Sequence, residues 1–350
     1  MKVAENILVI DLGGIGDLVL SIPFLRGLKT SFPSSKVSLL CPDRTGGILK
    51  DQPYIDTLYR SPIEALGIMQ MALKLRRMRF DLSVNLMPKA SLSAGIKIYI
   101  LFHLINAKLW AGRNTEGRGF FYDIKIEEEK MQMQNEVLIL GRLLRAIGGN
   151  TFEETLEYHI SEEQFVKAEN LLREETISSL NPLVAVNPGS DWSSRRWPIH
   201  RYADLLKRLK LRFSSIGFLV IGTGKEIMLA EQLRKEVGES VYILSGKTSS
   251  ETIPAILKYS DILITNDSGP SHVARAIGIP AVTLTGPGHP AYSKVKGKSE
   301  HVVIRHGVSC SPCVKKVCND MRCWESINVE EVFEEVSSLI RRKVRVEPVS

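Results

Sequence analysis

Residues 7–18, ILVIDLGGIGDL, decide the fold expected for this chain of 350 residues. The branched, apolar run at 7–10 predicts a buried strand, and the closely spaced glycines after Asp11 predict a tight turn, because glycine adopts backbone angles that other residues avoid. Asp17 then falls in the first turn of a predicted helix, where the helix dipole favours a carboxylate. A strand, a glycine turn and a helix in this order predict an α/β fold. Asp17 itself has two interpretations, a carboxylate that faces a ligand or a plain helix cap.

Apolar runs of strand length recur along the rest of the chain, with helical segments between them. They lie at 36–41, 54–59, 81–86 and 108–112 in the first half, and at 183–187, 216–221, 241–244, 261–265 and 281–284 in the second. Each run of the second half leads into a turn built from small or polar residues. This repetition is typical of doubly wound parallel sheets, which bind ligands at the carboxyl ends of their strands.

The length suits two domains of ordinary size. A charged stretch at 150–181, with helical sequence at 161–175, marks the join between them. We therefore expect an N-terminal domain at 1–160 and a C-terminal domain at 161–350, the second carrying a cysteine-rich segment at 310–323.

Composition and charge limit the partners. Hydrophobic residues make up 44% of the chain and charged residues 24%, as in ordinary globular proteins. The net charge of +7 favours anionic partners, but there is no long block of Lys or Arg, so nucleic acid is not expected. The N-terminal sequence has no cleavage site for a signal peptide, which predicts a cytoplasmic location. The most apolar window, 96–110, is too short and too polar to span a bilayer.

A predicted helix at 63–79 is rich in Met, Leu and Arg, and its cations are Lys74, Arg76, Arg77 and Arg79. A basic face of this kind suits lipid headgroups or phosphate groups. A solvated helix face is the simpler interpretation.

Four of the five cysteines, Cys310, Cys313, Cys318 and Cys323, follow the pattern C-x2-C-x4-C-x4-C. A cytoplasmic location disfavours disulfides between them. Structural zinc sites usually have a longer spacer between their cysteine pairs, so the pattern is a weak match to them. We expect no metal site, with zinc at these cysteines as the less favoured alternative.

Two glycine-rich loops resemble nucleotide-binding motifs without matching them. The loop GTGKE at 222–226 lacks the spacing of a phosphate-binding P-loop. The first loop, GGIGD, places Asp17 where a pyrophosphate would need backbone amides, which makes it a poor dinucleotide motif. Asp43, after the second predicted strand, keeps a nicotinamide-dependent oxidoreductase as an alternative.

The second half offers a better anion site. The sequence SDWSSRRWP at 190–198 places two guanidinium groups before a helix that Pro198 suits at its start, and arginine recognises phosphate with two parallel hydrogen bonds. The sequence NDSGPSH at 266–272 places a carboxylate, a hydroxyl and a glycine amide at a strand end. His272 alone is more often an ordinary helix residue than a ligand contact, but together with Arg195 and Asp267 it predicts a site for a ligand with phosphates and sugar hydroxyls.

Other ligand positions are expected in the first half. Lys89 and Ser91 follow the strand at 81–86, and Arg113 follows the strand at 108–112 on an expected polar loop. Loops beyond the carboxyl ends of parallel strands are where ligands bind.

The motifs VIDLGGIGDLVLSIPFLRGLKTSFP, NPGSDWSSRRWPIHRYADLL and LSGKTSSETIPAILKYSDILITNDSGPSHVARAIGIPAVTLTGP, with the CSPC tail, resemble the ADP-heptose:lipopolysaccharide heptosyltransferase family. The resemblance runs from about residue 5 to 335 and includes the order of the motifs. It implies a glycosyltransferase of the GT-B type, α/β with two Rossmann-like parallel-sheet domains that face a central cleft.

The resemblance also implies roles for individual residues. Asp17 is the expected general base in an inverting transfer of heptose from ADP-heptose. Gly14, Gly16, Lys89 and Arg113 are the expected acceptor-binding residues. The donor-binding residues implied are Ser190, Arg195, Glu226, Thr248, Asp267, Ser268, Gly269 and His272. No cofactor is required, because the ADP-sugar is itself a substrate, and no paired carboxylates suited to Mg²⁺ are evident.

The implied partners are ADP-heptose, a lipopolysaccharide core or lipid-linked acceptor, and the peripheral surface of the inner membrane. The chain departs from the family pattern at 286–290, GPGHP, and in the loop NLMPKAS at 85–91, which lacks the usual Gln. A related transferase that uses another nucleotide sugar and a non-catalytic nucleotide-sugar binding protein are the alternatives. A carboxylate at a helix start should also have a low pKa, which makes Asp17 a weak base unless burial raises that pKa.

Overall fold

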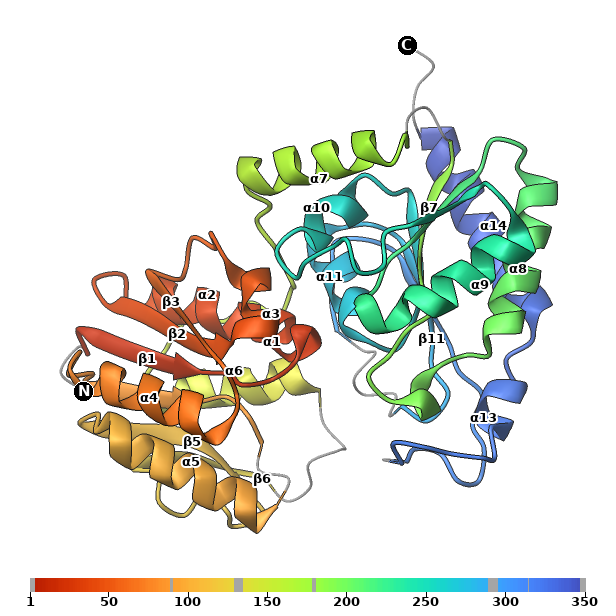
Figure 1. Cartoon of the computed structure of the whole chain (residues 1–350). Coiled ribbons are helices and arrows are strands. Elements are labelled where there is room, and N and C mark those ends of the chain that lie inside the picture. The colour runs from red at the N-terminus through yellow and green to blue at the C-terminus, as the bar shows by residue number, and fades with distance from the viewer. Residues whose placement is uncertain are drawn as a thin grey trace. The chain divides into compact units, whose positions relative to one another are not determined.

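The computed structural model describes residues 4–88, 91–128, 135–177, 181–288, 295–313 and 315–346. The chain forms two compact units, Met1–His159 with Lys294–Lys296, and Ile160–Ser293 with Gly297–Ser350. We call them the N-terminal and the C-terminal domain (Figure 1). The short return of the chain to the N-terminal domain was not expected from sequence, and it includes a hydrogen bond from the Leu156 N–H to the Lys296 carbonyl, at 3.1 Å.

The N-terminal domain is a six-stranded parallel sheet with strand order β3-β2-β1-β4-β5-β6. Its strands are β1 (Asn6–Ile10), β2 (Lys36–Pro42), β3 (Thr57–Ser61), β4 (Leu82–Asn85), β5 (Leu109–Thr115) and β6 (Ile124–Glu128). Its helices are α1 (Ile15–Leu20), α2 (Ile22–Ser31), α3 (Asp43–Gly46), α4 (Ala65–Arg76), α5 (Leu92–Ile105) and α6 (Glu136–Ala146), with a 3-10 turn η1 (Gly47–Leu49).

The C-terminal domain repeats this plan with strand order β12-β11-β10-β7-β8-β9, again all parallel. Its strands are β7 (Leu183–Asn187), β8 (Gly217–Val220), β9 (Val241–Ile243), β10 (Ile262–Asn266), β11 (Ala281–Leu284) and β12 (His301–Ile304). Its helices are α7 (Glu162–Glu174), α8 (Ile199–Arg212), α9 (Ile227–Val237), α10 (Ile253–Lys258), α11 (Gly269–Ile277), α13 (Arg322–Glu325) and α14 (Val329–Val346), with 3-10 turns η2 (Ser193–Arg195) and η3 (Gly224–Glu226).

The central strands are buried on both faces, as parallel sheets require. All four residues at 7–10 of β1 are fully buried, and β7, β8, β10 and β11 are buried along their whole length. This explains why the central strands appear in the sequence as continuous apolar runs. The predicted fold class, two doubly wound parallel-sheet domains, is confirmed.

The direction of strand addition reverses once in each sheet, between β1 and β4 and between β7 and β10. Ligands of open α/β sheets bind at such a reversal, beyond the carboxyl ends of the two strands. In the N-terminal domain this position belongs to the glycine loop after β1. In the C-terminal domain it belongs to the loops at 187–190 and 266–269.

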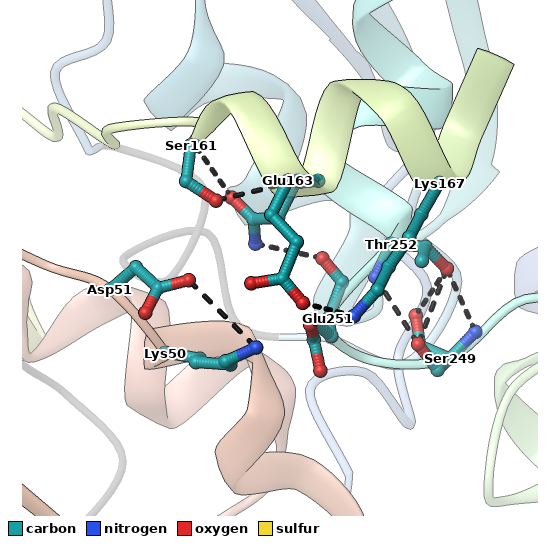
Figure 2. A network of polar contacts seen from close by, with 9 residues as sticks. Lys50, Asp51, Ser161, Glu163, Lys167, Ser249, Glu251 and Thr252 are labelled. Atoms are coloured by element: carbon teal, nitrogen blue, oxygen red, sulfur yellow. Dashed lines mark hydrogen bonds and ion pairs between the residues drawn. The ribbon is translucent and has the colours of Figure 1, made fainter.

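Helix α7 is attached to the C-terminal domain by a polar network (Figure 2). The Lys167 ammonium lies 2.7 Å from the Glu163 carboxylate and 2.7 Å from that of Glu251, and the buried Gln164 side chain donates to the Glu251 carbonyl at 2.8 Å. The Lys50–Asp51 ion pair in the same figure belongs to the N-terminal domain, with a nitrogen–oxygen distance of 4.0 Å. Exposed ion pairs contribute little, about 0–1 kcal/mol each, so the buried glutamine is the stronger anchor.

Candidate functional site

The glycine loop presents Asp17 at the carboxyl end of β1. The Asp17 side chain is exposed, and its carboxylate accepts a hydrogen bond from the Gly14 N–H at 2.8 Å. Gly13 must be a glycine here, because a Cβ atom at this position would lie 2.5 Å from the Asp17 Cβ. The helix-cap interpretation of Asp17 is therefore real, and it leaves the carboxylate accessible to a ligand.

A second carboxylate, Asp11, lies behind this loop. It is buried and accepts a hydrogen bond from the Gly13 N–H at 3.0 Å. Burial, and then the charge of Asp17, raise the pKa of Asp11 to about 7. Sequence reasoning missed Asp11, although a polar residue directly after a buried strand was a usable signal.

Arg113 lies inside β5 and not on the expected polar loop, because the strand continues to Thr115. Its guanidinium is fully buried, donates to the Glu128 carboxylate at 2.5 Å, and also pairs with Glu136. This ion pair holds Glu136 at the start of α6. Burial raises the pKa of Glu136, the Arg113 guanidinium lowers it, and the charge of Asp17 raises it by a smaller amount. The Arg113 guanidinium is therefore engaged by carboxylates of its own domain.

The remaining acceptor predictions fall at the same loop or outside the described residues. Gly14 is the exposed N-cap of α1 and Gly16 is half-buried in its first turn. Lys89 lies outside the described residues.

Asn266 organises the reversal point of the C-terminal sheet. Its side-chain oxygen accepts hydrogen bonds from the Trp197 N–H and the Tyr202 hydroxyl, both at 3.0 Å. Its side-chain nitrogen donates to the carbonyls of Pro188 and Gly189, at 2.9 and 3.2 Å. One buried amide therefore fixes the loop after β7, the end of β10 and the arginine segment before α8. The motif at 266–272 is recognisable in the sequence, but the role of Asn266 is not.

The structure brings Arg195 and Asp267 into electrostatic contact, as the sequence predicted. The Arg195 guanidinium lies 4.5 Å above the Trp192 ring, and its buried Nε has no hydrogen-bond partner. Burial raises the pKa of Asp267, while Arg195 and Arg275 lower it. Gly288 lies against this carboxylate, because a Cβ atom there would be 2.6 Å from its Oδ2. Arg275, a buried cation on α11, is a residue of this cluster that sequence reasoning missed.

The other donor predictions gather around the same strand ends. Ser268 is the N-cap of α11, Gly269 is its first residue, and His272 follows one turn later. His272 is buried, its Nδ1 has no hydrogen-bond partner, and burial lowers its pKa to about 3, so it is neutral. The side chain of Ser268 lies 3.4 Å from the Asn187 amide.

Three further predicted positions occupy the loops after β7, β8 and β9. The Ser190 carbonyl accepts two hydrogen bonds from Arg196, at 2.9 and 2.6 Å. The Glu226 carboxylate is buried and accepts from the Thr223 N–H at 2.8 Å. Thr248 donates to the carbonyls of Gly222 and Leu244, both at 3.5 Å. Glu226 therefore stabilises its own loop. Ser190 and Thr248 are half-buried beyond the carboxyl ends of β7 and β9.

Known proteins match this chain along most of its length. The family model described as "Glycosyltransferase family 9 (heptosyltransferase)" matches residues 68–323. The chain belongs to glycosyltransferase family 9. It is therefore a glycosyltransferase of the heptosyltransferase family.

Individual relatives of this family 9 glycosyltransferase are distant but nearly full-length. Lipooligosaccharide heptosyltransferase 2 of Haemophilus influenzae is 24% identical over 82% of this chain and 85% of its own length. The protein of the same name from Campylobacter jejuni is 24% identical over 93% of this chain and 96% of its own length.

Solved structures share the fold. The family 9 glycosyl transferase of Veillonella parvula has a TM-score of 0.80 at 20% identity, covering 98% of this chain and 99% of the other. ADP-heptose lps heptosyltransferase II of E. coli has a TM-score of 0.77 at 20% identity, covering 97% of this chain and 99% of the other.

The cysteine-rich segment of the family 9 glycosyltransferase supports the arginine loop. The Ser194 hydroxyl donates a hydrogen bond to the Lys315 carbonyl at 2.5 Å, and the Ser194 N–H donates to the Lys316 carbonyl at 3.3 Å. The Trp324 indole in turn donates to the Ser194 carbonyl at 2.7 Å. The cysteines are free, with Cys310 exposed and Cys323 buried. No three His, Cys, Asp or Glu side chains in the described part of the chain are grouped to hold a metal ion. Burial and the nearby thiols raise the pKa of Cys323 to about 11.

Two histidines, the buried His272 and the partly buried His301, predict a loss of stability in acid. Burial lowers the pKa of His272 to about 3 and that of His301 to about 2, whereas an unfolded histidine has a pKa of about 6.5. Their neutral forms stabilise the fold above pH 6.5, and this contribution is lost as the pH falls below that value. Asp11 has the opposite sign, because its folded pKa is raised, and its contribution is lost as the pH rises from about 4 to about 7.

The variant His301→Gln isolates one of these contributions. Between pH 6.5 and 5, the wild type should lose about 1–2 kcal/mol more unfolding free energy than the variant. Gln can still bond to Thr283, which lies 2.7 Å from the His301 Nε2. Urea unfolding at the two pH values measures the difference, with the exposed His200→Gln as the matched control. Equal pH dependence in all three proteins would contradict the assignment.

Proposed function

We propose that this chain transfers a heptose from ADP-heptose to a lipopolysaccharide core acceptor, with inversion at the anomeric carbon and Asp17 as the general base. One observation carries the proposal. Arg195, Asp267, Ser268 and His272 gather at the reversal point of the C-terminal sheet, where a nucleotide is expected to bind.

The C-terminal domain is proposed as the donor domain. Arg195 has an unused donor for a diphosphate oxygen, and the start of α11 offers backbone amides to the same anion. Asp267 accepts hydrogen bonds from sugar or ribose hydroxyls. Solved structures of E. coli heptosyltransferase WaaC, which shares the fold, were obtained with ADP and with ADP-2-deoxy-2-fluoro heptose, and this supports an ADP-sugar as the donor.

The N-terminal domain is proposed as the acceptor domain, with Gly14 and Gly16 leaving the backbone open to a sugar. An acceptor hydroxyl attacks the anomeric carbon, the bond from that carbon to the diphosphate oxygen breaks, and Asp17 takes the hydroxyl proton. ADP leaves as an anion, whose growing charge is stabilised by Arg195 and the amides of α11. The proposal therefore requires no cofactor.

The proposed partners are ADP-heptose, the lipopolysaccharide core or a lipid-linked acceptor, and the cytoplasmic surface of the inner membrane, where such an acceptor lies. No helix among the described residues is long and apolar enough to cross a membrane.

A second candidate is a related transferase with another nucleotide sugar, favoured by the departure from the family pattern at 286–288 beside Asp267. A panel of ADP-, UDP- and GDP-sugars, each with a lipopolysaccharide core, separates the two. We expect acceptor-dependent nucleotide release with ADP-heptose. Release with a UDP- or GDP-sugar alone would favour the second candidate, and binding without release would favour a non-catalytic binding protein.

A further inference from the structure

Exposed apolar side chains are concentrated on two neighbouring helices of the N-terminal domain. Eighteen large hydrophobic residues are exposed in the described part of the chain, and nine of them lie between residues 63 and 100. Helices α4 and α5 pack side by side on this domain (Figure 1). Single exposed apolar residues are ordinary, but a contiguous group marks an interaction surface.

The exposed residues follow the helical repeat and form one stripe on each helix. On α4 the stripe is Leu66, Met69 and Leu73, exposed by 65, 45 and 49%. On α5 the stripe is Leu92, Ile96 and Ile100, exposed by 67, 52 and 49%. Spacings of three, four and seven residues on α4, and of four and eight on α5, place these side chains on one side of each helix. We call these two stripes with their neighbouring cations the α4–α5 face.

The opposite sides of both helices are already occupied by the domain core. Ala72 and Leu75 of α4, and Leu101, Phe102 and Ile105 of α5, are buried in one hydrophobic cluster. Helix α5 is therefore apolar on both sides, although only one side has a protein partner within its own domain. An α-helix that is apolar all round is expected to be covered on all sides.

The charge on this face is strongly one-sided. Lys74, Arg76, Arg77, Arg79 and Lys97 are all exposed, and none of them makes an ion pair with a described residue. From residue 65 to 108, the described residues include one carboxylate, Asp81, which pairs with Lys108 at 2.6 Å. Apolar stripes bordered by cations without an ion-pair partner are complementary to a surface in which anionic groups cover an apolar layer.

We propose that the α4–α5 face docks on the surface of an anionic lipid bilayer, with the apolar stripes inserted at the level of the headgroups. The cations then lie among the lipid phosphates. In this arrangement the protein lies on the membrane through this face. The inference rests on the proposed function in that the membrane surface is one of its proposed partners, but it concerns a different surface from the donor site and needs no nucleotide.

Vesicle binding tests this proposal with the full-length protein and no nucleotide sugar. The vesicles are phosphatidylcholine with or without phosphatidylglycerol. A charge variant replaces Lys74, Arg76, Arg77 and Arg79 by Gln, and an apolar variant replaces Leu66, Leu73 and Ile96 by Gln. The matched controls remove exposed residues of the C-terminal domain, Lys207, Arg212, Lys235 and Arg341 for charge, and Val166, Leu211 and Met228 for apolar area.

We expect the wild type to sediment with the anionic vesicles and not with the neutral ones. The charge variant should bind the anionic vesicles about 100-fold more weakly, because each cation removed costs roughly fivefold in affinity and the four effects are partly screened by one another. The apolar variant should bind at least tenfold more weakly. Both control variants should bind like the wild type. Unchanged melting temperatures show that the variants are folded, and unchanged turnover of a water-soluble, deacylated core shows that the site is intact.

Three results would overturn the proposal. The first is equal binding to neutral and anionic vesicles, and the second is equal loss of binding in the control variants. The third is an apolar variant that keeps full vesicle binding but changes an oligomer of the wild type into a monomer, which would make this face an interface between copies of the chain. Loss of the proposed transfer activity with vesicle binding intact would count against the proposed function alone.

Discussion

The variant Asp17→Asn is expected to lower acceptor-dependent ADP release by at least 100-fold, with ADP affinity within about twofold of the wild type. Asn has nearly the same shape as Asp and can still accept the hydrogen bond from the Gly14 N–H, which is 2.8 Å long in the wild type. It cannot take a proton from an acceptor hydroxyl. The change therefore removes the proposed base without removing the helix cap.

The matched control for this prediction is Asp43→Asn, which changes a carboxylate in the first turn of α3, beyond the carboxyl end of β2 in the same sheet. It should keep wild-type turnover. Release of ADP is measured with and without acceptor, and ADP affinity is measured by calorimetry. If Asp17→Asn keeps more than a tenth of the activity, Asp17 is not the base.

The variant Arg195→Ala is expected to weaken ADP binding by about 10- to 100-fold, the usual effect of losing a hydrogen bond to a charged group. The Arg195 Nε has no partner in the protein, and its guanidinium stacks over Trp192, so the side chain is already oriented for an anion. Because the residue makes few internal bonds, the melting temperature should change little. Arg195→Lys keeps the positive charge and should recover part of the affinity.

Arg196→Ala is the informative neighbour for this prediction. Arg196 donates two hydrogen bonds to the Ser190 carbonyl and lies 3.7 Å from the Glu226 carboxylate. Its loss should lower the melting temperature more than the loss of Arg195. Equal effects of Arg195→Ala on ADP binding and on acceptor binding would count against a phosphate role for Arg195.

The central strands could be predicted from sequence because both of their faces are buried, so they appear as continuous apolar runs. Of the four edge strands, β3 and β9 were predicted in this way, whereas β6 and β12 were not. β6 ends in Glu127, whose carboxylate accepts a hydrogen bond from Asn114, and Glu128, which forms an ion pair with Arg113. β12 has only four residues, most of them partly exposed. Edge strands have one neighbour and tolerate short or polar sequences, and β6 and β12 are the two that lack an apolar run long enough to recognise.

Helix α5 was missed for a different reason. Its exposed and its buried sides are both apolar, so the sequence has no helical alternation at this position. The same property indicates the α4–α5 face as an interaction surface. A helix that lacks the usual alternation of apolar and polar residues can therefore mark a surface that is covered by a partner instead of water.

At the candidate site, the sequence correctly predicted that the loops at 187–190 and 266–269 follow buried strands. It did not reveal the residues that hold those loops. The role of Asn266 depends on contacts with Trp197 and Pro188, which lie about 70 to 80 positions away in the chain. The burial of Arg113 depends on the length of β5, and strand ends are the least reliable part of a sequence prediction.

The anomeric configuration of the product is the most direct test of the proposed transfer. The purified protein is incubated with ADP-heptose and a deacylated lipopolysaccharide core, and the product is analysed by mass spectrometry and NMR. The proposal predicts a core enlarged by one heptose, linked with the configuration opposite to that in the donor, and one ADP released per linkage. Retention of configuration, or ADP release without a glycosylated core, would contradict an inverting transfer with Asp17 as the base.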